Sequence, residues 1–391
     1  MSDLQILMVS ILLFQNGMEL DLMVLIFLIL IFSCPFISSL AFPYLELIYS
    51  AGLLCFFGIY LIYKKFSFSK LQSMLYPIIL FILALAISLV FSQNKLNSLW
   101  ELYKYISMIL LFLVAASLSE KDKSLTIQTI ILSGLVVSLL AIYQYFFGFG
   151  HVLSYLSNNG FSFPFALDYL QSKRVFAPFV TPGILGGYLA MIIPLALINK
   201  DKVWLVLPVF FALFLTMSLG AFLSLFCALL IFFGAREKLK KKHFFSLIGL
   251  FILIVIIFTW RSMAQREHVH PVFSILMRLS YWKETLEIIK AHPLAGVGLG
   301  NFNLNMSRYA HNSYLQIWAE MGLLGLFSFV WLVYVVIKSR FIDLKQSLYN
   351  NQAVCLLAAT TVFLIHNFLD FTFFLPEVAF IWWVILGLIV A

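Results

Sequence analysis

The chain has 391 residues, of which 63% are hydrophobic and only 11% are charged. A soluble domain of this length needs a far more polar surface, so the composition indicates a polytopic membrane protein. The net charge of +8 does not indicate nucleic-acid binding, because the basic residues lie mainly in short loops between apolar segments, where membrane topology accounts for them.

Apolar segments of about the length that a spanning helix needs follow one another along the chain. We therefore predict an all-α transmembrane helix bundle of about twelve spans, forming a single transmembrane domain over 1–391. The predicted spans are 20–38, 41–62, 71–92, 99–118, 125–147, 175–198, 203–217, 220–234, 244–260, 311–337, 352–373 and 375–391. Residues 4–14 are apolar but lack a basic start and a small-residue cleavage site, so they do not indicate a cleaved signal peptide.

The orientation of the bundle follows from the positions of lysine and arginine. They gather in alternate short loops, at 64–70, 121–123, 200–202, 236–242 and 338–345. An excess of basic residues in short loops marks the cytoplasmic side. The two long loops, 148–174 and 261–310, are then predicted to face outward.

The larger outer loop, 261–310, contains a helical pattern. Apolar residues recur at helical spacing, at Ile275, Leu279, Trp282, Leu286 and Ile289. This spacing predicts an amphipathic helix over 274–291, lying on the membrane surface or on the bundle, with Arg278 at the margin of its apolar stripe.

Ionisable residues are scarce outside this loop, so we expect chemistry on a charged substrate to take place there. His311 lies where the loop meets the next apolar span, and Asn312 or Ser313 can cap that helix. A helix N-terminus disfavours imidazolium, which predicts a neutral histidine able to act as a base. The alternative is a histidine that only forms a hydrogen bond at the start of the helix.

Two arginines are candidates for binding an anion. Arg174 ends the first outer loop and precedes a helix whose first half contains Pro178, Pro182 and the glycines 183, 186 and 187. Small residues there allow close helix approach or a broken helix that lines a cavity. Arg174 and Arg278 could each hold a diphosphate through the planar fork of the guanidinium. The alternative for both is an ordinary cation at the membrane interface.

Asp370 lies near the outer end of the penultimate span. A carboxylate at that depth is costly unless it is paired, and we predict one of the rim arginines as its partner. His366, one helical turn earlier, is expected to make a structural hydrogen bond, and Glu377 is expected at the membrane interface.

Several motifs do not indicate a cofactor. GVGLGNF at 296–302 lacks the preceding strand of a dinucleotide-binding site and reads as a glycine-rich turn that returns the chain to the membrane. No metal site is predicted at His268 and His270. The four cysteines lie inside apolar segments and form no CxxC pair, which makes a disulfide or a zinc site improbable.

Four segments together, in this order, resemble the O-antigen ligase and polymerase superfamily. They are KRVFAPFVTPGILGGYLAMIIPLAL at 173–197, RLSYWKETLEIIKAHPLAGVGLGNF at 278–302, HNSYLQIWAEMGLLGLFSF at 311–329 and HNFLDFTFFLPE at 366–377. The resemblance implies a multi-pass glycosyltransferase of the bacterial inner membrane whose active site faces the periplasm. It implies no metal and no cofactor.

The donor implied by the resemblance is a glycan linked to undecaprenyl diphosphate, and the acceptor is lipid A-core or another glycan, with membrane lipids around the protein. By motif match Arg174 and Arg278 would bind the donor diphosphate and His311 would be the catalytic histidine. Asp370 would be the acidic residue of the last outer turn, and Asn312 would support the site. One departure is clear. Many members carry an arginine in a Ser-Arg-Gly segment, whereas this chain reads TMSLGAF at 216–222.

Other functions remain open at this point. An O-antigen or polysaccharide polymerase differs from the ligase only in its acceptor, and a protein O-oligosaccharyltransferase is a third enzyme of this kind. Outside the enzymes, a flippase or transporter of lipid-linked glycans has a similar number of spans. Transporters usually show inverted repeats and ionisable groups at mid-membrane, whereas here the charges concentrate in an outer loop.

Overall fold

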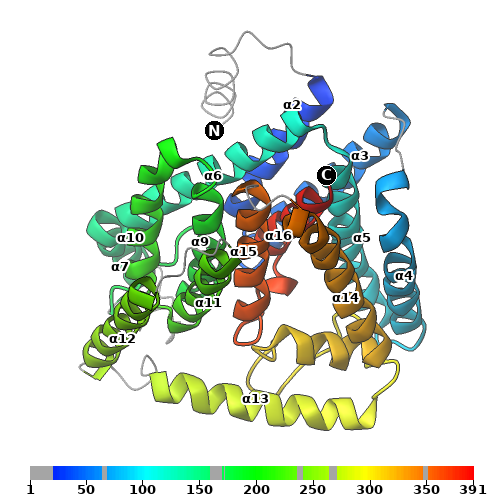
Figure 1. The fold of residues 1–391 in the computed structure, drawn as a ribbon. Coiled ribbons are helices and arrows are strands. Elements are labelled where there is room, and N and C mark those ends of the chain that lie inside the picture. The colour runs from blue at the N-terminus through cyan, green and yellow to red at the C-terminus, as the bar shows by residue number, and fades with distance from the viewer. Residues whose placement is uncertain are drawn as a thin grey trace.

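The computed structural model describes residues 21–63, 68–158, 170, 172–235, 241–263, 271–346 and 351–391. All regular structure in these residues is helical, as predicted (Figure 1). The main helices are α2 (Leu22–Ser33), α3 (Pro43–Tyr63), α4 (Leu75–Val90), α5 (Lys95–Ser117), α6 (Glu120–Tyr143), α7 (Phe149–Asn158), α9 (Pro182–Ala196), α10 (Val206–Thr216), α11 (Leu219–Ala235), α12 (Lys241–Met263), α13 (Pro271–Ala291), α14 (Ser313–Gln346), α15 (Asn351–His366) and α16 (Pro376–Val390). Short 3-10 segments are η1 (Cys34–Phe36), η2 (Phe68–Met74), η4 (Lys200–Leu205) and η6 (Thr372–Phe374), and η3 (Gln144–Gly148) is a π-helical turn.

The helices have the length and composition of a membrane protein. Five described segments are long and apolar enough to cross a membrane: Pro43–Tyr60, Leu71–Val90, Lys95–Ser117, Glu120–Ser154 and Ser313–Arg340. Shorter apolar helices occupy Leu22–Phe36, Pro182–Ala196, Val203–Thr216, Leu219–Ile231, Phe244–Trp260, Asn351–His366 and Pro376–Val390. The total of about twelve spans stays a prediction, because the shorter helices fall below the roughly 20 residues of a full span.

The helix before the first outer loop is longer than predicted. Helical structure continues from α6 through η3 and α7 to Asn158, whereas we placed the start of the loop at 148. Gly148 and Gly150 do not end it, since a glycine inside a helix costs only about 1 kcal/mol relative to alanine. The next helix is shorter than predicted and starts at Pro182, because prolines disfavour helix in the residues before them. Thr181 caps it by accepting a hydrogen bond from the Ile184 amide at 3.3 Å.

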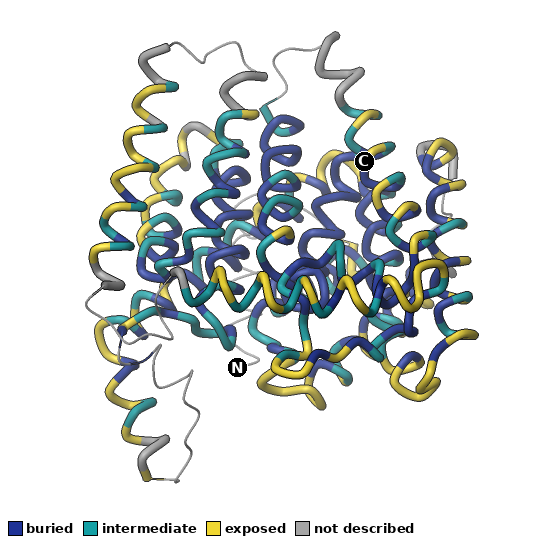
Figure 2. Tube along the Cα trace, turned by 90° about the horizontal axis from the view of Figure 1, so that it is seen from below, coloured by how far each residue is buried: buried dark blue, intermediate teal, exposed yellow. Residues whose placement is uncertain are grey.

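The centre of the bundle is formed by α16, which is buried along nearly its whole length, including Trp382 and Trp383. Figure 2 shows the buried residues concentrated in the central helices and the exposed ones toward the periphery. Glu377, in the first turn of α16, is only 1% exposed and accepts a hydrogen bond from the Ser39 amide at 3.2 Å. Our expectation that Glu377 lies at the membrane interface was therefore wrong, because the helix that carries it is central.

Helix α13 crosses one end of the bundle, below the ends of α9, α11, α14 and α15 in the view of Figure 1. Its position in the sequence agrees with the amphipathic helix predicted at 274–291. The apolar stripe is divided: Ile289 is buried against the protein, whereas Ile275, Leu279 and Leu286 are exposed. Arg278 lies on the side that faces the bundle. A membrane location for the exposed half remains a prediction.

The glycine-rich turn packs into a break in α14. Gly322 has a φ of 68° and interrupts the helix. The carbonyl groups of Ala319 and Glu320 accept hydrogen bonds from the amides of Val297 (2.9 Å) and Gly298 (3.0 Å). The Leu323 amide in turn donates to the Pro293 carbonyl at 3.0 Å. The loop thus satisfies backbone groups that the interrupted helix leaves open, which attaches it firmly to α14.

Candidate functional site

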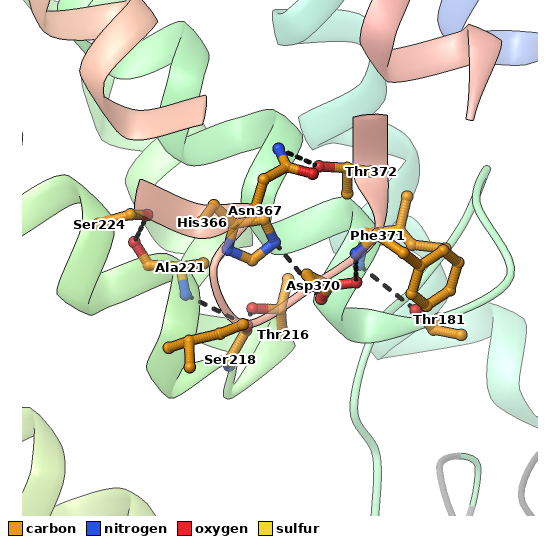
Figure 3. A network of polar contacts seen from close by, with 12 residues as sticks. Thr181, Thr216, Ser218, Ala221, Ser224, His366, Asn367, Asp370, Phe371 and Thr372 are labelled. Atoms are coloured by element: carbon orange, nitrogen blue, oxygen red, sulfur yellow. Dashed lines mark hydrogen bonds and ion pairs between the residues drawn. The ribbon is translucent and has the colours of Figure 1, made fainter. Parts of the chain in front are cut away.

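The turn that follows α15 is fixed by one asparagine (Figure 3). The side-chain oxygen of Asn367 accepts hydrogen bonds from the Ser313 hydroxyl at 2.6 Å and the Phe373 amide at 2.9 Å. Its side-chain nitrogen donates to the Phe363 carbonyl at 2.9 Å and to the Thr372 hydroxyl at 3.0 Å. Since Ser313 begins α14, this asparagine ties the start of α14 to the turn that carries Asp370.

Asp370 is 5% exposed and lies in that turn. Its Oδ1 accepts a hydrogen bond from the Phe371 amide at 2.8 Å, and its Oδ2 lies 3.4 Å from Nε2 of His366. The side chain that contacts the Asp370 carboxylate is therefore His366, and our prediction of a rim arginine as its direct partner was wrong. The cause is local, because α15 ends at His366 and the chain then turns back, bringing the carboxylate onto the imidazole.

The surroundings of Asp370 favour the charged carboxylate. Burial alone would raise its pKa. The hydrogen bond from His366, together with the electrostatic influence of His366, His311 and the Arg278 guanidinium, outweighs burial and lowers the pKa of Asp370 to about 2. Its Oδ2 also lies at the first turn of α9, 2.7 Å from where a Cβ at Gly183 would be, and a helix N-terminus stabilises negative charge.

His311 lies just before α14 in a left-handed backbone conformation with a φ of 50°. Its ring stacks on Tyr281 with ring centroids 5.5 Å apart and meets the ring of Phe371 edge-on at 4.7 Å. Within the described part of the chain its buried Nδ1 has no hydrogen-bond partner. Left-handed backbone costs a residue other than glycine of order 1–3 kcal/mol, and such strain gathers at functional sites.

The imidazole of His311 is neutral at physiological pH. Burial lowers its pKa most, the nearby charge of Arg278 lowers it further and the charge of Asp370 raises it, and the net value is about 4. This confirms the neutral ring expected from the sequence, but burial rather than the helix N-terminus is the main cause. The predicted helix cap is Asn312, whose Oδ1 accepts hydrogen bonds from the amides of Tyr314 and Leu315, each at 3.1 Å.

Arg278 points from α13 toward the bundle. Its Nε donates to the Leu369 carbonyl at 2.8 Å, and its Nη1 donates to the hydroxyl of Ser274. The guanidinium is therefore joined to the residue that precedes Asp370, and its charge acts on both Asp370 and His311. The structure thus brings Arg278, His311 and Asp370 together.

Arg174 is bound to the turn between α10 and α11. Its Nε donates to the Thr216 carbonyl at 3.0 Å and its Nη2 to the Met217 carbonyl at 3.5 Å. The same turn borders the Asp370 segment, since a Cβ at Gly220 would lie 3.7 Å from the side chain of Leu369. Arg174 thus lies against a turn that borders residue 369, whose carbonyl accepts a hydrogen bond from Arg278.

Sequence reasoning missed some of the residues that build this site. His366 was treated as structural, and the aromatic rings of Tyr281 and Phe371 that flank His311 were not considered. The spacing of four between His366 and Asp370 was the available signal. The histidines 268 and 270 and Arg266 lie outside the described residues.

The fold and the site define a class of protein. It is an all-helical membrane protein in which a buried imidazole, a carboxylate and a guanidinium lie together at one end of the bundle. Residues 204–330 match the family model described as O-Antigen ligase. This region contains Arg278, His311 and Asn312, whereas Arg174 and Asp370 lie outside it. The match confirms the resemblance seen in the sequence and supports placing the chain in the O-antigen ligase superfamily, among membrane glycosyltransferases of the ligase or polymerase kind. A search of curated proteins finds no match.

Proposed function

We propose that this protein transfers a glycan from undecaprenyl diphosphate to lipid A-core at the periplasmic face of the bacterial inner membrane. The observation that carries the proposal is the position of His311, a buried and neutral imidazole close to the charges of Asp370 and Arg278. These are the three kinds of group that such a transfer requires.

In the reaction a hydroxyl oxygen of the acceptor forms a bond to C1 of the donor glycan. The bond from C1 to the diphosphate oxygen breaks, and the diphosphate leaves with the electron pair. The proton of the hydroxyl passes to His311, and Asp370 stabilises the imidazolium that forms. In-line displacement of this kind inverts the anomeric centre.

His311 needs a higher proton affinity during the reaction than the surrounding protein groups alone give it. A diphosphate that enters beside it brings negative charge, which raises the pKa of the imidazole toward neutrality. Burial of the ring strengthens this effect, because charges interact more strongly where water is excluded. Donor binding therefore prepares the base.

The role that we propose for Arg278 and Arg174 is to bind the donor diphosphate and to stabilise the charge that develops on it. Both guanidinium groups are held by backbone carbonyls, Arg278 by that of Leu369 and Arg174 by that of Thr216 in the turn that borders Leu369. Fixed donors aimed at developing charge usually make the largest contribution to catalysis. This chain has no arginine in the segment where many family members read Ser-Arg-Gly. The guanidinium of Arg174 donates to carbonyl groups of that same segment, so Arg174 could supply the missing positive charge.

The test is glycan transfer by the purified protein in detergent, with a lipid-diphosphate-linked glycan as donor. We expect His311→Ala to lower kcat about 10²- to 10⁴-fold, the usual contribution of a general base, while the protein still inserts into membranes. His292→Ala is the matched control, because His292 is an exposed histidine at the end of α13. Transfer at the wild-type rate by a well-expressed His311→Ala protein would remove His311 from the mechanism.

The acceptor is tested by competition between lipid A-core and a second lipid-linked glycan. The ligase that we propose extends lipid A-core, whereas preferential growth of the lipid-linked glycan identifies a polymerase. Transfer in detergent also excludes a flippase as the sole function, because no compartment is present to be crossed.

A further inference from the structure

His366 and Asp370 form a buried pair, of which the proposed reaction uses only Asp370. His366 is the last residue of α15 and is 2% exposed, and Figure 3 shows its ring directed at the carboxylate. The separation of 3.4 Å is longer than an ordinary charge-assisted hydrogen bond of roughly 2.7–2.9 Å. Contacts between catalytic groups often tighten when substrate binds.

Two glycines of α9 form the recess that receives this pair. A Cβ at Gly187 would lie 2.3 Å from Cδ2 and 2.4 Å from Nε2 of His366, and a Cβ at Gly183 would lie 2.7 Å from Oδ2 of Asp370. The two glycines are one helical turn apart and thus share one face of the helix. Each costs about 1 kcal/mol of helix stability relative to alanine, so helix stability does not explain them. Space for the imidazole and the carboxylate does.

Every ionisable group that acts on Asp370 from the surrounding elements is a base. His366 acts from α15, His311 from the segment before α14 and Arg278 from α13. The first turn of α9 contributes only Gly183, Thr181 and the positive end of the helix. The Asp370 carboxylate therefore stays an anion. The orientation of its side chain is set by His366, the side chain that it contacts.

We propose that His366 is a positioning residue, which lies over Gly187 and holds the Asp370 carboxylate in the orientation that stabilises His311 as it takes the proton of the acceptor hydroxyl. This inference rests on the proposed function and assigns a role to a residue outside it. His366 exchanges no proton in the reaction. It acts only through Asp370.

The experiment uses the full chain in detergent, with the same lipid-linked donor, and measures kcat, KM and the pH profile. We expect His366→Ala to lower kcat roughly 10- to 100-fold, the range seen when an outer partner that orients a functional side chain is removed, with the KM for the donor unchanged. The acid limb of the profile is expected to move to higher pH, because Asp370 remains buried without the partner that lowers its pKa. His366→Gln keeps a hydrogen-bond donor and should restore part of kcat.

Two further variants separate positioning from general damage to the fold. Gly187→Ala displaces the His366 ring without removing it and should reproduce the shift of the acid limb. Thr360→Val is the matched control on α15, since Thr360 is fully buried and its hydroxyl has no hydrogen-bond partner among the described residues. A wild-type rate and profile in His366→Ala, or a lower rate with an unmoved acid limb, would overturn the proposal.

A double-mutant cycle in thermal unfolding tests the pair without any assay of transfer. His366→Ala and Asp370→Asn should shift Tm by less in combination than the sum of the two single shifts, because each removes the same contact. Additive shifts would overturn the pairing. If the wild-type protein transfers no glycan to any acceptor, the proposed function fails and the positioning role fails with it, while the cycle still reports whether the pair exists.

Discussion

At the scale of single residues, two opposing influences act on each of the two central ionisable groups. Burial favours the uncharged form of both His311 and Asp370. Burial dominates for His311, which stays neutral, whereas the surrounding positive charge dominates for Asp370, which stays ionised. The result is a neutral base near a negative charge, with burial setting the state of His311 and the neighbouring groups setting that of Asp370.

These shifts predict a pH dependence of stability. The folded-state pKa of His311, about 4, lies below the ordinary value of 6.5, so on acidification the unfolded chain binds the proton first and stability falls between about pH 6.5 and pH 4. The lowered pKa of Asp370 contributes stability that is present above about pH 4 and is lost as the pH falls toward 2. Both groups therefore destabilise the protein in acid.

The measurement is Tm as a function of pH for the purified protein in detergent. We expect the fall of Tm between pH 7 and pH 5 to be smaller in His311→Gln than in the wild type, because glutamine binds no proton in either state. An equal fall in both proteins would show that His311 does not have the lowered pKa described above.

The sequence indicates the main residues of the site because polar groups are rare in so apolar a chain. Arg278, His311 and Asp370 each stand out for this reason, and the structure brings them together. The partner of Asp370 could not be predicted, since it depends on α15 ending at His366 and on a recess formed by Gly183 and Gly187 of another helix. The end of α15 and the recess in α9 both depend on tertiary packing, which the local sequence pattern does not specify.

At the scale of elements, α14 shows how a loop and a helix complete each other. A single spanning helix was predicted over 311–337, and the structure has a longer helix, Ser313–Gln346, with an interruption at Gly322. The sequence signal was weak, because one glycine in an apolar run is compatible with an unbroken helix. The amides of Val297 and Gly298 occupy the interruption from outside the helix.

The interruption predicts a strong effect of Gly322→Ala. A Cβ at this position would lie 1.8 Å from the Leu294 carbonyl oxygen, and the φ of 68° is unfavourable for alanine. We expect a loss of more than about 2 kcal/mol of stability, seen as a lower Tm and a lower yield of folded protein. Gly52→Ala is the control, because Gly52 lies inside α3 with nothing within 4 Å of the added Cβ. A Tm of Gly322→Ala equal to that of the control would contradict this account.

Other elements were predicted in kind but not in extent. The apolar pattern located α10 and α11 as two short helices, and the turn between them at 216–219 follows the predicted position closely. The ends of α7 and α9 were misplaced, because a glycine-containing segment remained helical and a proline-containing one did not. Periodicity finds the middle of a helix better than its ends.

At the scale of the whole molecule, the antiparallel course of the helices brings distant segments of the chain to one end of the bundle. The starts of α9, α14 and α16 and the ends of α10 and α15 meet near α13 (Figure 1). Hydrogen bonds from Ser313 to Asn367 and from Arg278 to Leu369 join three of these segments. The polar site is thus composed of helix ends, which leaves the apolar middle of the bundle intact.

The predicted orientation is tested by cysteine labelling in intact cells, with the four native cysteines replaced by alanine. Met306 is 73% exposed on the segment between α13 and α14, and Met306→Cys should react with a membrane-impermeant maleimide added outside. Asp201, exposed in η4, is predicted to face the cytoplasm, and Asp201→Cys should react only after the membrane is opened. The reverse pattern would invert the topology and place the site on the cytoplasmic side.

The way in which residues 293–298 fill the gap in α14 limits how substrates can enter. The segment between α13 and α14, residues 292–312, is called the strap here. It is hydrogen-bonded to α14 near its first residues and continues into the start of α14 at its last. It cannot swing outward like a lid without exposing amide and carbonyl groups that have no other partner. Under the proposed function, two lipid-anchored substrates would therefore reach a largely preformed centre by lateral movement in the bilayer, rather than by an outward opening of this strap.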